Sequence, residues 1–345
     1  EAVTLAGVWD RMLQAWPYSP QALFAVGFSV LLEVTTIVVS LIFVVLERCR
    51  LCQRWRVHTN PEISSPPAEL VQEALRDHLV SGLLLRPLIT FFTFPIFTWC
   101  GMETSTETLP TLTQVCIHVF LCMLIDDTWF YWTHRALHHR WFYSRIHKQH
   151  HRFRFTHVLA SEFAHPVEDL SNSFGTMLGP LILGSHMSVA WLYGVIKLAQ
   201  VRTAPMCDSS GKIVCFSLSH LHWRVVLTMH VCCSVLCAAR LHAIVFVCSM
   251  DLLESALHRL ADDRVTQWLR CTISTVTVEP AVRAGGEQGR HEFHHSRNVG
   301  NFGGFFNWWD RLCGTDAEYE AWRAAGSPPL KEIVNTVGKP SNKQS

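Results

Sequence analysis

The sequence predicts an all-α fold, in which a multi-pass membrane domain of helices carries a histidine-rich cap on the cytosolic side. Composition is the first reason, because 49% of the 345 residues are hydrophobic and only 17% are charged, against about 25% charged residues in soluble domains. The second reason is a series of apolar stretches near the roughly 20 residues that a membrane-crossing helix needs. The third is a set of histidine motifs that an apolar core could not satisfy.

Charge and cysteine usage argue against other classes of protein. The formal net charge is +1, so no acidic or basic excess indicates a nucleic-acid partner. The 13 cysteines lie largely in or beside apolar stretches without regular spacing, which favours reduced thiols over a disulfide scaffold. The 13 tryptophans and 20 phenylalanines suit anchoring at a membrane interface.

The first predicted membrane helix covers residues 20–47 and contains one acid, Glu33. It is followed at residues 48–58 by "RCRLCQRWRVH", whose arginines place this flank in the cytosol by the positive-inside tendency. Residues 59–77 include "NPEISSPPAEL" and are expected to form a polar cytosolic linker. Residues 1–78 are therefore expected to be an N-terminal unit of membrane helix and linker.

Two further segments are expected to form a hairpin through the membrane. Residues 79–101 are apolar but contain Arg86 and two prolines, so this segment is the weaker candidate and would be kinked if helical. Residues 111–132 follow a short polar loop and return the chain to the cytosol. Asp126 and Asp127 lie near the exit of this segment, where an acid is costly unless it is paired or interfacial.

The apolar run at residues 173–199 has two interpretations. As a single span, it would place everything after it in the lumen. As a re-entrant segment or helical hairpin, it would keep the C-terminal histidines on the same side as the earlier ones. Breaks at Gly179-Pro180 and Gly184-Ser185 make the hairpin at least as plausible as the single span.

Three histidine motifs carry the chemistry, and they share helical spacings. The first, at residues 134–139, has histidines four apart, and the motifs at 147–151 and 291–295 both follow the pattern i, i+3, i+4. Residues at these spacings share one face of a helix and can approach one ion. The candidate ligands are His134, His138, His147, His150, His151, His291, His294 and His295.

Eight imidazoles exceed the three protein ligands of a typical catalytic zinc site, so they suit two metal ions. Oxygen chemistry would favour iron as the metal. The alternative is a basic histidine cluster at the membrane interface, which accounts for any single histidine better than for a repeated spacing. His58, His78, His118 and His220 lack the motif context and are interpreted as structural.

The motifs "HRALHH", "HKQHH" and "HEFHH" resemble the three histidine boxes of the membrane fatty acid hydroxylase/sterol desaturase superfamily. The flanking stretches "DDTWFYWTHRALHH", "SEFAHPVED", "GPLILGSHMS" and "NWWDRLCGTD" resemble its sterol C4-methyl monooxygenase branch, including the relatives named as fatty acid hydroxylase domain-containing proteins. The resemblance covers about residues 79–199 and 285–320. Three boxes in order with matching flanks are specific to this superfamily.

The resemblance implies a four-helix-type membrane domain whose cytosolic cap holds a non-haem di-iron centre. It implies O2 activation with electrons from NAD(P)H, delivered through cytochrome b5 or its reductase, in the endoplasmic reticulum membrane. The eight motif histidines become the iron ligands. His165, in "AHP", matches a further family histidine that lies either near the metals or in a structural role.

The function implied by the resemblance is hydroxylation of a lipid, with a C4-methylsterol in sterol biosynthesis as the leading substrate. One alternative is a fatty acyl or sphingolipid hydroxylase. Another is a non-catalytic membrane protein that keeps the boxes as a structural metal site.

The chain departs from the family pattern after residue 200. The family has a further histidine in a turn such as "HSGY" or "HCGY" between the second and third boxes, and this turn is absent here. About 105 residues separate His186 from His291, where the family needs only a few tens. We interpret residues 201–284 as either a genuine insertion, with an extra apolar helix at 224–250, or a gene-model artefact, and we favour the artefact.

Under either interpretation the second metal site is in doubt, and the chain as written is expected to have little or no activity. The predicted catalytic domain therefore comprises residues 79–200 and 285–320. Residues 321–345 are expected to form a C-terminal tail.

Overall fold

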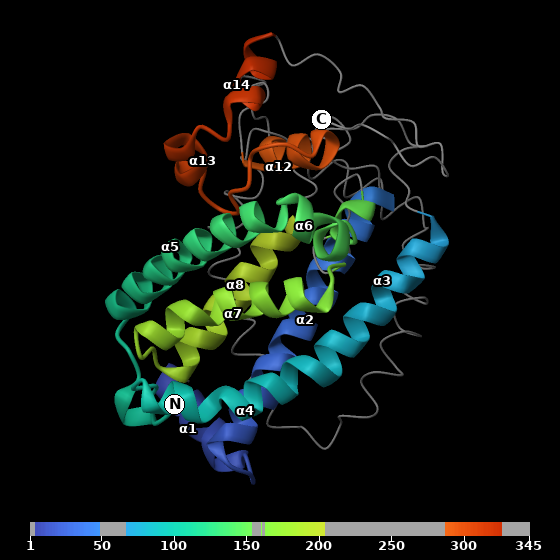
Figure 1. Cartoon of the computed structure of the whole chain (residues 1–345). Coiled ribbons are helices and arrows are strands. Elements are labelled where there is room, and N and C mark those ends of the chain that lie inside the picture. The colour runs from blue at the N-terminus through green and yellow to red at the C-terminus, as the bar shows by residue number, and fades with distance from the viewer. Residues whose placement is uncertain (1–3, 49–66, 154–159, 161–162, 204–286, 326–345) are drawn as a thin grey trace, which may run out of the picture.

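The computed structural model describes residues 4–48, 67–153, 160, 163–203 and 287–325. Within these ranges the secondary structure is helical, with short π and 3-10 turns and no β-strand. Long helices lie side by side in the body of the molecule, and the last three helices gather at one end (Figure 1). The predicted all-α class is confirmed.

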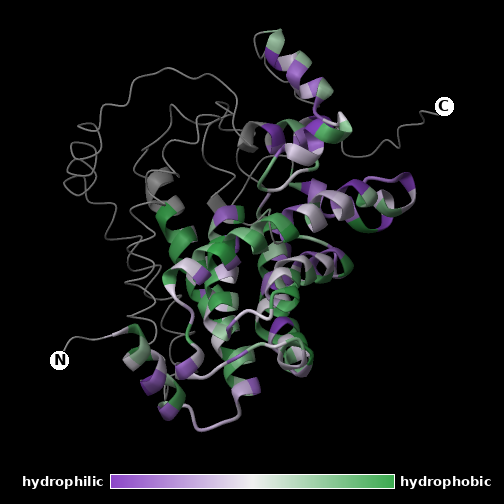
Figure 2. Ribbon diagram, turned by 90° about the vertical axis from the view of Figure 1, so that its left-hand side faces the viewer, coloured by the Kyte–Doolittle hydropathy of each residue, from purple (hydrophilic) through white to green (hydrophobic). Residues whose placement is uncertain are grey.

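Three helical stretches are long and apolar enough to cross a membrane, at Pro20–Ile42, Ala68–Trp99 and Leu112–Leu137. They correspond to α2 (Pro20–Arg48), to the continuous run of α3 (Ala68–Val80), a π-turn and α4 (Arg86–Trp99), and to α5 (Leu112–Leu137). Figure 2 shows hydrophobic colouring gathered in the middle of the helical body. The three predicted segments are therefore present.

Two helix boundaries differ from the prediction. Helix α3 begins at Ala68, inside the expected polar linker, because residues after the prolines have good helix formers and no further breaker. Helix α5 continues to Leu137, five residues past the expected end, and so carries the first histidine motif on a membrane helix. Its start is fixed by a capping box in which Thr111 and Gln114 bond each other's backbone N–H groups.

The charges inside the first two spans pair with each other. The Glu33 carboxylate on α2 lies 3.0 Å from His78 Nε2 on α3 and 3.3 Å from Arg86 Nη1 at the start of α4. Between them, the π-turn Ser81–Leu85 carries Gly82, where a Cβ would collide with the Glu33 carboxylate. Pairing removes much of the penalty of placing these charges among apolar helices.

The apolar run at 173–199 forms two helices and not a single span. Helix α7 (Pro166–Ile182) ends at a tight turn containing Gly184, whose φ of +53° favours glycine, and α8 (Met187–Thr203) follows. Helix α7 packs on α5, and α8 packs on α2. At the crossing of α7 and α5, a Cβ on Gly179 would strike the backbone of Cys122, so glycine is needed there. This is the hairpin of the two interpretations.

The main apolar core lies where α2, α4 and α8 meet an additional N-terminal helix, α1 (Leu5–Ala15). The Trp9 ring of α1 meets Trp191 edge-on, and its indole N–H donates to the Thr104 carbonyl oxygen at 3.0 Å. Sequence analysis did not anticipate α1, although Thr4 is a good N-cap and Val8, Trp9 and Met12 share one face.

Asp126, one of the two acids near the end of the third span, is also paired. It accepts a hydrogen bond from the Tyr193 hydroxyl at 2.8 Å and lies 2.7 Å from Lys197 Nζ. Both partners come from α8, so this carboxylate ties α8 to α5.

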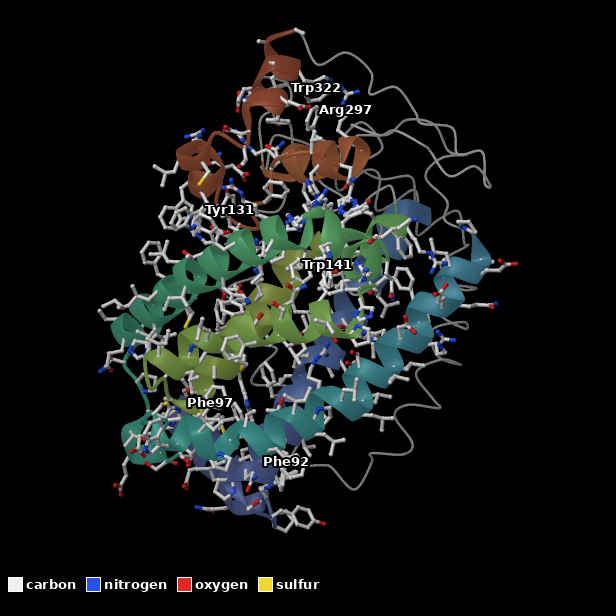
Figure 3. All side chains as sticks on the ribbon, viewed as in Figure 1. Phe92, Phe97, Tyr131, Trp141, Arg297 and Trp322 are labelled. Carbon is white, nitrogen blue, oxygen red and sulfur yellow. The ribbon has the colours of Figure 1, made fainter. Side chains whose placement is uncertain are left out.

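The C-terminal cap (residues 287–325) comprises α12 (Glu287–Arg297), α13 (Trp308–Cys313) and α14 (Ala317–Ala324). It lies over the end of α5 that carries the first histidine motif, near Tyr131, with Trp322 and Arg297 in its outer part (Figure 3). Buried Arg290 joins α12 to α14 through Asp316 at 3.2 Å and Glu320 at 2.6 Å.

Several sequence interpretations fall outside the described residues. They include most of the segment 201–284, with the possible helix at 224–250, and the arginine-bearing flank after Arg48. The end of the predicted C-terminal tail also lies outside, whereas α14 extends to Ala324 and so covers the beginning of that tail. Helix α8 ends at Thr203, just inside the start of the segment 201–284.

We predict that Glu33→Leu destabilises the protein by about 3 kcal/mol or more, because Arg86 would keep a largely buried charge without its partner. The double variant Glu33→Leu/Arg86→Leu should recover much of this loss, since both charges are then gone. The measurement is the unfolding midpoint of each variant in detergent micelles. A double variant less stable than Glu33→Leu would contradict the pairing argument.

Candidate metal centre

The structure gathers all eight motif histidines at the boundary between the helical body and the cap. They form two groups, within each of which the ligand nitrogens lie within 4.8 Å of one another. The five-histidine group comprises His134, His138, His147, His151 and His294, and the three-histidine group comprises His150, His291 and His295.

The second and third motifs are each divided between the two groups. In the second motif, His147 and His151 join the five-histidine group while His150 joins the other. In the third motif the assignment is reversed, so that His291 and His295 belong to the three-histidine group. The i, i+4 pair of each motif thus stays together, and the i+3 histidine crosses to the neighbouring group.

The motifs reach the two groups from different backbone structures. His134 lies in the last turn of α5 and His138 is the C-cap of that helix, which keeps both on one face. The second motif is not on a regular α-helix, because a π-turn ends at His147 and a 3-10 turn covers His150–Arg152. The ring of His150 turns towards His295 at a centroid distance of 4.8 Å. In the third motif, His294 separates from His291 and His295 in the same way within the regular helix α12. The expectation that all three histidines of a motif approach one ion is therefore wrong for both motifs.

Hydrogen bonds at Nδ1 orient the rings. His134 donates to the Phe302 carbonyl oxygen at 3.0 Å, and His294 donates to that of Gly300 at 2.6 Å. A carbonyl oxygen can only accept, so Nδ1 carries the proton and each neutral ring directs an Nε2 lone pair into its group. His295 is oriented in the same way by the carbonyl oxygen of Phe153 at 3.2 Å.

The nitrogens that face inward fit a metal ion. His151 Nε2 lies 3.0 Å from His147 Nε2, and His295 Nε2 lies 3.0 Å from His291 Nε2. Imidazoles bound to one ion at about 2.0–2.1 Å have nitrogens separated by roughly 3.0–3.4 Å. The Nε2 atoms of His134 and His294 are buried and have no hydrogen-bond partner, so a metal would satisfy them.

The electrostatics keep the ligands neutral. Both groups contain histidines that follow the end of α5 in the chain. Burial lowers the pKa values of these histidines, and repulsion between neighbouring rings lowers them further. Neutral imidazole is the form that binds metal. The pKa falls to about 4 for His138 and His150, to about 3 for His291 and to about 2 for His151.

Glu168, in the first turn of α7, is a site residue that the motifs did not reveal. Its Oε1 lies 2.9 Å from His147 Nδ1, and both side chains are buried. Burial raises the pKa of Glu168 to about 8, and it also lowers the pKa of His147 far below its ordinary value. The Nδ1–H of neutral His147 donates to Glu168, which leaves the Nε2 lone pair of His147 in the group. The stretch "SEFAHPVED" contained Glu168, but only its packing against His147 identifies its role.

A buried carboxylate on α5 holds the loop that supplies the carbonyl groups. Asp127 Oδ1 accepts hydrogen bonds from the backbone N–H groups of Phe305 and Phe306 at 2.7 and 3.0 Å. Its Oδ2 accepts one from Trp308 Nε1 at 2.8 Å. Asp310 holds the preceding part of the loop by accepting from the N–H groups of Phe302 and Gly303, each at 2.9 Å.

The comparisons with known proteins agree with this geometry. Residues 119–204 match the fatty acid hydroxylase family model. Methylsterol monooxygenase 2-2 of Arabidopsis thaliana is 30% identical over 53% of this chain and 67% of its own length. Methylsterol monooxygenase 1 of Danio rerio is 24% identical over 66% of this chain and 54% of its own length. The chain belongs to the fatty acid hydroxylase family.

The resemblance to the fatty acid hydroxylase/sterol desaturase superfamily is thereby confirmed, and the relatives include its sterol methyl oxidase branch. A very-long-chain aldehyde decarbonylase of Oryza sativa subsp. indica is also similar, with 28% identity over 58% of this chain and 72% of its own length. No solved structure matches the chain. Family membership and the similarity to monooxygenases indicate an oxygen-dependent monooxygenase.

Other histidines of this family member lie apart from the two groups. His165 caps α7, where its Nδ1 accepts the N–H of Val167 at 3.2 Å, and it belongs to neither group. His139 is exposed and caps the short helix α6 (Arg140–Phe142). His118 bonds Ser185 at 3.0 Å, and His78 pairs with Glu33.

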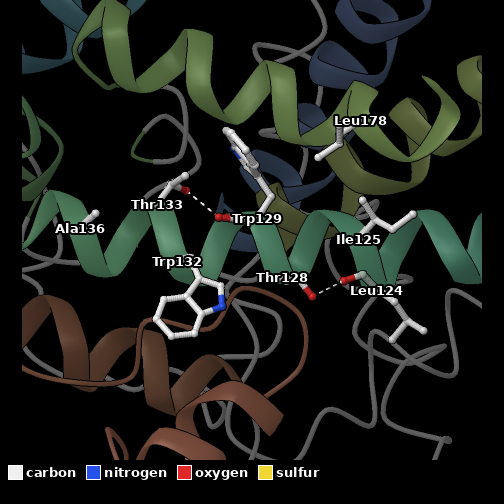
Figure 4. Close-up of a pocket in the computed structure, with 8 residues that line it drawn as sticks. All are labelled: Leu124, Ile125, Thr128, Trp129, Trp132, Thr133, Ala136 and Leu178. Atoms are coloured by element: carbon white, nitrogen blue, oxygen red, sulfur yellow. Dashed lines mark hydrogen bonds between the residues drawn. The ribbon is translucent and has the colours of Figure 1, made fainter. Parts of the chain in front are cut away.

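An apolar pocket of about 520 Å³ lies along α5 but does not face the centre. Its lining includes Trp129, Trp132 and Ala136 of α5 and Leu178 of α7 (Figure 4). At about 100° per residue, Trp132 and Ala136 lie on the side of the helix opposite His134. The pocket therefore belongs to the outer surface of the helical body and gives no route to the histidines.

We predict that Asp127→Ala lowers metal affinity by about 10–100-fold, the range for groups that orient ligands indirectly. The reason is that the loop carrying the Gly300 and Phe302 carbonyl groups would lose three hydrogen bonds to α5. The measurement is metal content per chain after dialysis against a graded chelator.

Asp126→Asn is the matched control, because Asp126 contacts α8 and not the cap loop. Both variants are expected to lower thermal stability, but only the Asp127 variant should lose metal more easily. Equal retention by the two variants would show that the Asp127 contacts do not position the ligands.

Proposed function

We propose that this chain is a membrane-bound, non-haem di-iron oxygenase that hydroxylates a lipid, with a C4-methylsterol as the leading substrate. The observation that carries the proposal is the pair of histidine groups at the end of a membrane-length helix. Eight inward-facing imidazoles, the ligands that the described residues supply, suit two redox-active ions more than a structural zinc site, which needs four ligands. The named relatives support the sterol as substrate, since two of those compared are methylsterol monooxygenases.

A second candidate is an acyl-chain substrate, as in a fatty acyl or sphingolipid hydroxylase. The similarity to a very-long-chain aldehyde decarbonylase supports it, because that protein's name refers to a long-chain aldehyde. The non-catalytic alternative, a membrane protein with a structural metal site, is favoured only by the small number of ligands in one group.

Iron bound in the two groups would supply O2 activation, with two electrons provided from outside the chain. The chain's own residues orient the histidines and keep them neutral before iron binds. The carbonyl oxygens of Gly300 and Phe302 fix the protons of His294 and His134 at Nδ1, and Glu168 does the same for His147. Burial keeps the rings neutral, so ligand formation needs little proton loss at pH 7.

The remaining parts of the proposal concern the cell. Electrons would come from NAD(P)H through cytochrome b5 or its reductase, and the endoplasmic reticulum membrane would hold the protein. The histidine groups would face the cytosol, which the arginines after the first span support. The lipid substrate would reach the centre from the membrane, since α5 runs from the apolar body to the histidines.

The departure from the family pattern after residue 200 predicts little or no activity, whereas the assembled histidine groups support turnover. We predict that the chain, expressed in cells unable to remove C4 methyl groups, lowers the level of accumulated 4-methylsterols, and an unchanged sterol and acyl-chain profile would support the inactive alternative. His147→Ala and His294→Ala should abolish this effect while the protein stays inserted in the membrane, because these residues supply ligands and not membrane helices. His165→Asn is the matched control, since asparagine also caps a helix but offers no imidazole.

The measurements are the sterol profile and membrane extraction of each variant. Unchanged 4-methylsterols together with new hydroxylated acyl chains would support the acyl substrate. Turnover retained by both alanine variants would exclude the di-iron proposal, and loss in His165→Asn would add His165 to the functional histidines.

We also predict that single cysteines placed at exposed Arg140 and Arg297 react with a membrane-impermeant thiol reagent from the cytosolic side. Both positions belong to segments that must share one centre, so they must share one side of the membrane. The measurement is labelling of intact microsomes before and after permeabilisation. Labelling of either site only after permeabilisation would contradict the proposed orientation.

A further inference from the structure

One face of α3 lies against the second histidine motif, although the sequence predicted only a linker over most of this helix. Glu73 of α3 pairs with Arg152, the last residue of the 3-10 turn His150–Arg152, through two contacts of 2.7 Å each. One turn further along α3, Asp77 Oδ2 accepts a hydrogen bond from Gln149 Nε2 at 3.2 Å. Polar contacts with α3 therefore lie immediately before and after the two histidines of this turn.

A small apolar core accompanies these polar contacts. Leu70 and Ala74 of α3 are buried in one cluster with Phe153, Ala160 and Phe163. The two α3 residues and the two acids that contact the motif follow the spacing i, i+3, i+4 and i+7, which defines one helical face. The same face of α3 therefore provides both the apolar and the polar contacts.

The residues of this core also contribute backbone carbonyl groups to the metal centre. The Nδ1–H of His295 donates to the carbonyl oxygen of Phe153 at 3.2 Å. The backbone carbonyl groups of Ala160 and Phe163 interact with the ring of His150. Packing against α3 therefore affects the orientation of two histidine rings, as the cap loop does for rings of the five-histidine group.

Helix α3 is suited to positioning because it is the end of a membrane-length helical run. The stretch Ala68–Trp99 has 32 residues, which span about 48 Å at 1.5 Å per residue, whereas the hydrocarbon core is roughly 30 Å thick. All the acids of this stretch lie in its first ten residues. The α3 end is therefore the part that extends out of the membrane, and it reaches the second motif as a continuous helix.

We propose that this face of α3, formed by Leu70, Glu73, Ala74 and Asp77, is a positioning surface that holds the second histidine motif in the geometry that binds metal. The proposal rests on the two-metal centre proposed above and names residues on which that centre depends. Because the 3-10 turn carries one histidine of each group, this one surface affects both groups. Its residues act through the motif and contribute no ligand of their own.

The test uses the full-length protein in detergent micelles, loaded with Co(II), whose visible absorption reports the geometry of its ligands. Chelator is increased stepwise, and cobalt per chain is measured together with the absorption. Glu73→Gln should lose cobalt at about two- to fivefold lower chelator concentration, the effect of one partly exposed ion pair. The cobalt that stays bound should show a changed absorption spectrum.

Thermal stability is measured on the same samples to separate positioning from a general loss of structure. The side chains of Glu73 and Arg152 are 33% and 47% exposed, so removal of their contact should change the unfolding midpoint little. Asp126→Asn gives the opposite reference, because it should lower stability without changing the absorption of bound cobalt.

Two further comparisons show whether the effect comes from the contact itself. Arg152→Gln and the double variant Glu73→Gln/Arg152→Gln should each match Glu73→Gln, because all three remove the same contact. Glu69→Gln is the matched control, since it removes the same charge from an exposed position in the first turn of α3. It should match the unaltered protein.

The outcomes separate this inference from the proposed function. Unchanged cobalt loss and absorption in Glu73→Gln would overturn the positioning role and leave the two-metal centre standing. Additive losses in the double variant, or an equal effect of Glu69→Gln, would also overturn it, since the cause would then be charge and not the contact. Uptake of one cobalt by the unaltered protein would overturn the two-metal centre, and the same comparison would still decide the role of α3. Uptake of no cobalt would overturn both.

Discussion

The contact between Asp127 and the cap loop is the interaction on which the rest of the centre depends. One buried carboxylate on α5 accepts hydrogen bonds from two backbone N–H groups and one indole N–H of the loop at 305–308. At about 100° per residue, Asp127, Tyr131, His134 and His138 lie on one face of α5. Tyr131 extends the same line of contacts to Thr315 at 3.1 Å. One face of α5 therefore positions the cap and, through the cap loop, orients histidines. The same face also contributes His134 and His138 to the centre.

Local patterns were enough to predict the eight histidines that gather in two groups and the three long apolar helices, because spacing and hydropathy are properties of short segments. They could not show that the second and third motifs are each divided between two groups, because this depends on how α12 packs against the segment that follows α5. Nor did they show that a π-turn and a 3-10 turn replace a regular helix in the second motif. The local patterns could not predict the roles of Glu168 and Asp127 for another reason. Each acts across a long sequence separation, on His147 and on residues 305–308 respectively, and nothing in the neighbouring residues records these contacts.

In the described helical body, the buried or half-buried acids Glu33 and Asp126 each have partners on another helix. Glu33 of α2 meets His78 and Arg86, and Asp126 of α5 meets Lys197 and Tyr193 of α8. An unpaired charge among apolar helices is expensive, so such pairs restrict which helices can be neighbours. They contribute specificity of packing more than net stability. The sequence showed the charges, but only the fold shows that they are matched.

The Nε2 lone pairs of the neutral rings point at one another, so the metal-free centre is electrostatically unfavourable. A bound metal would remove this repulsion, and the repulsion therefore links metal binding to assembly of the cap. Helix α12 contributes His294 to one group and both His291 and His295 to the other. An ion in either group would therefore connect α12 to the segment that follows α5. The hydrogen bonds of Asp127 and Asp310 hold the loop after α12, and the metal would hold α12 itself. Because binding to an assembled site adds its free energy to folding, the cap is the part of this fold whose stability should depend most on the metal.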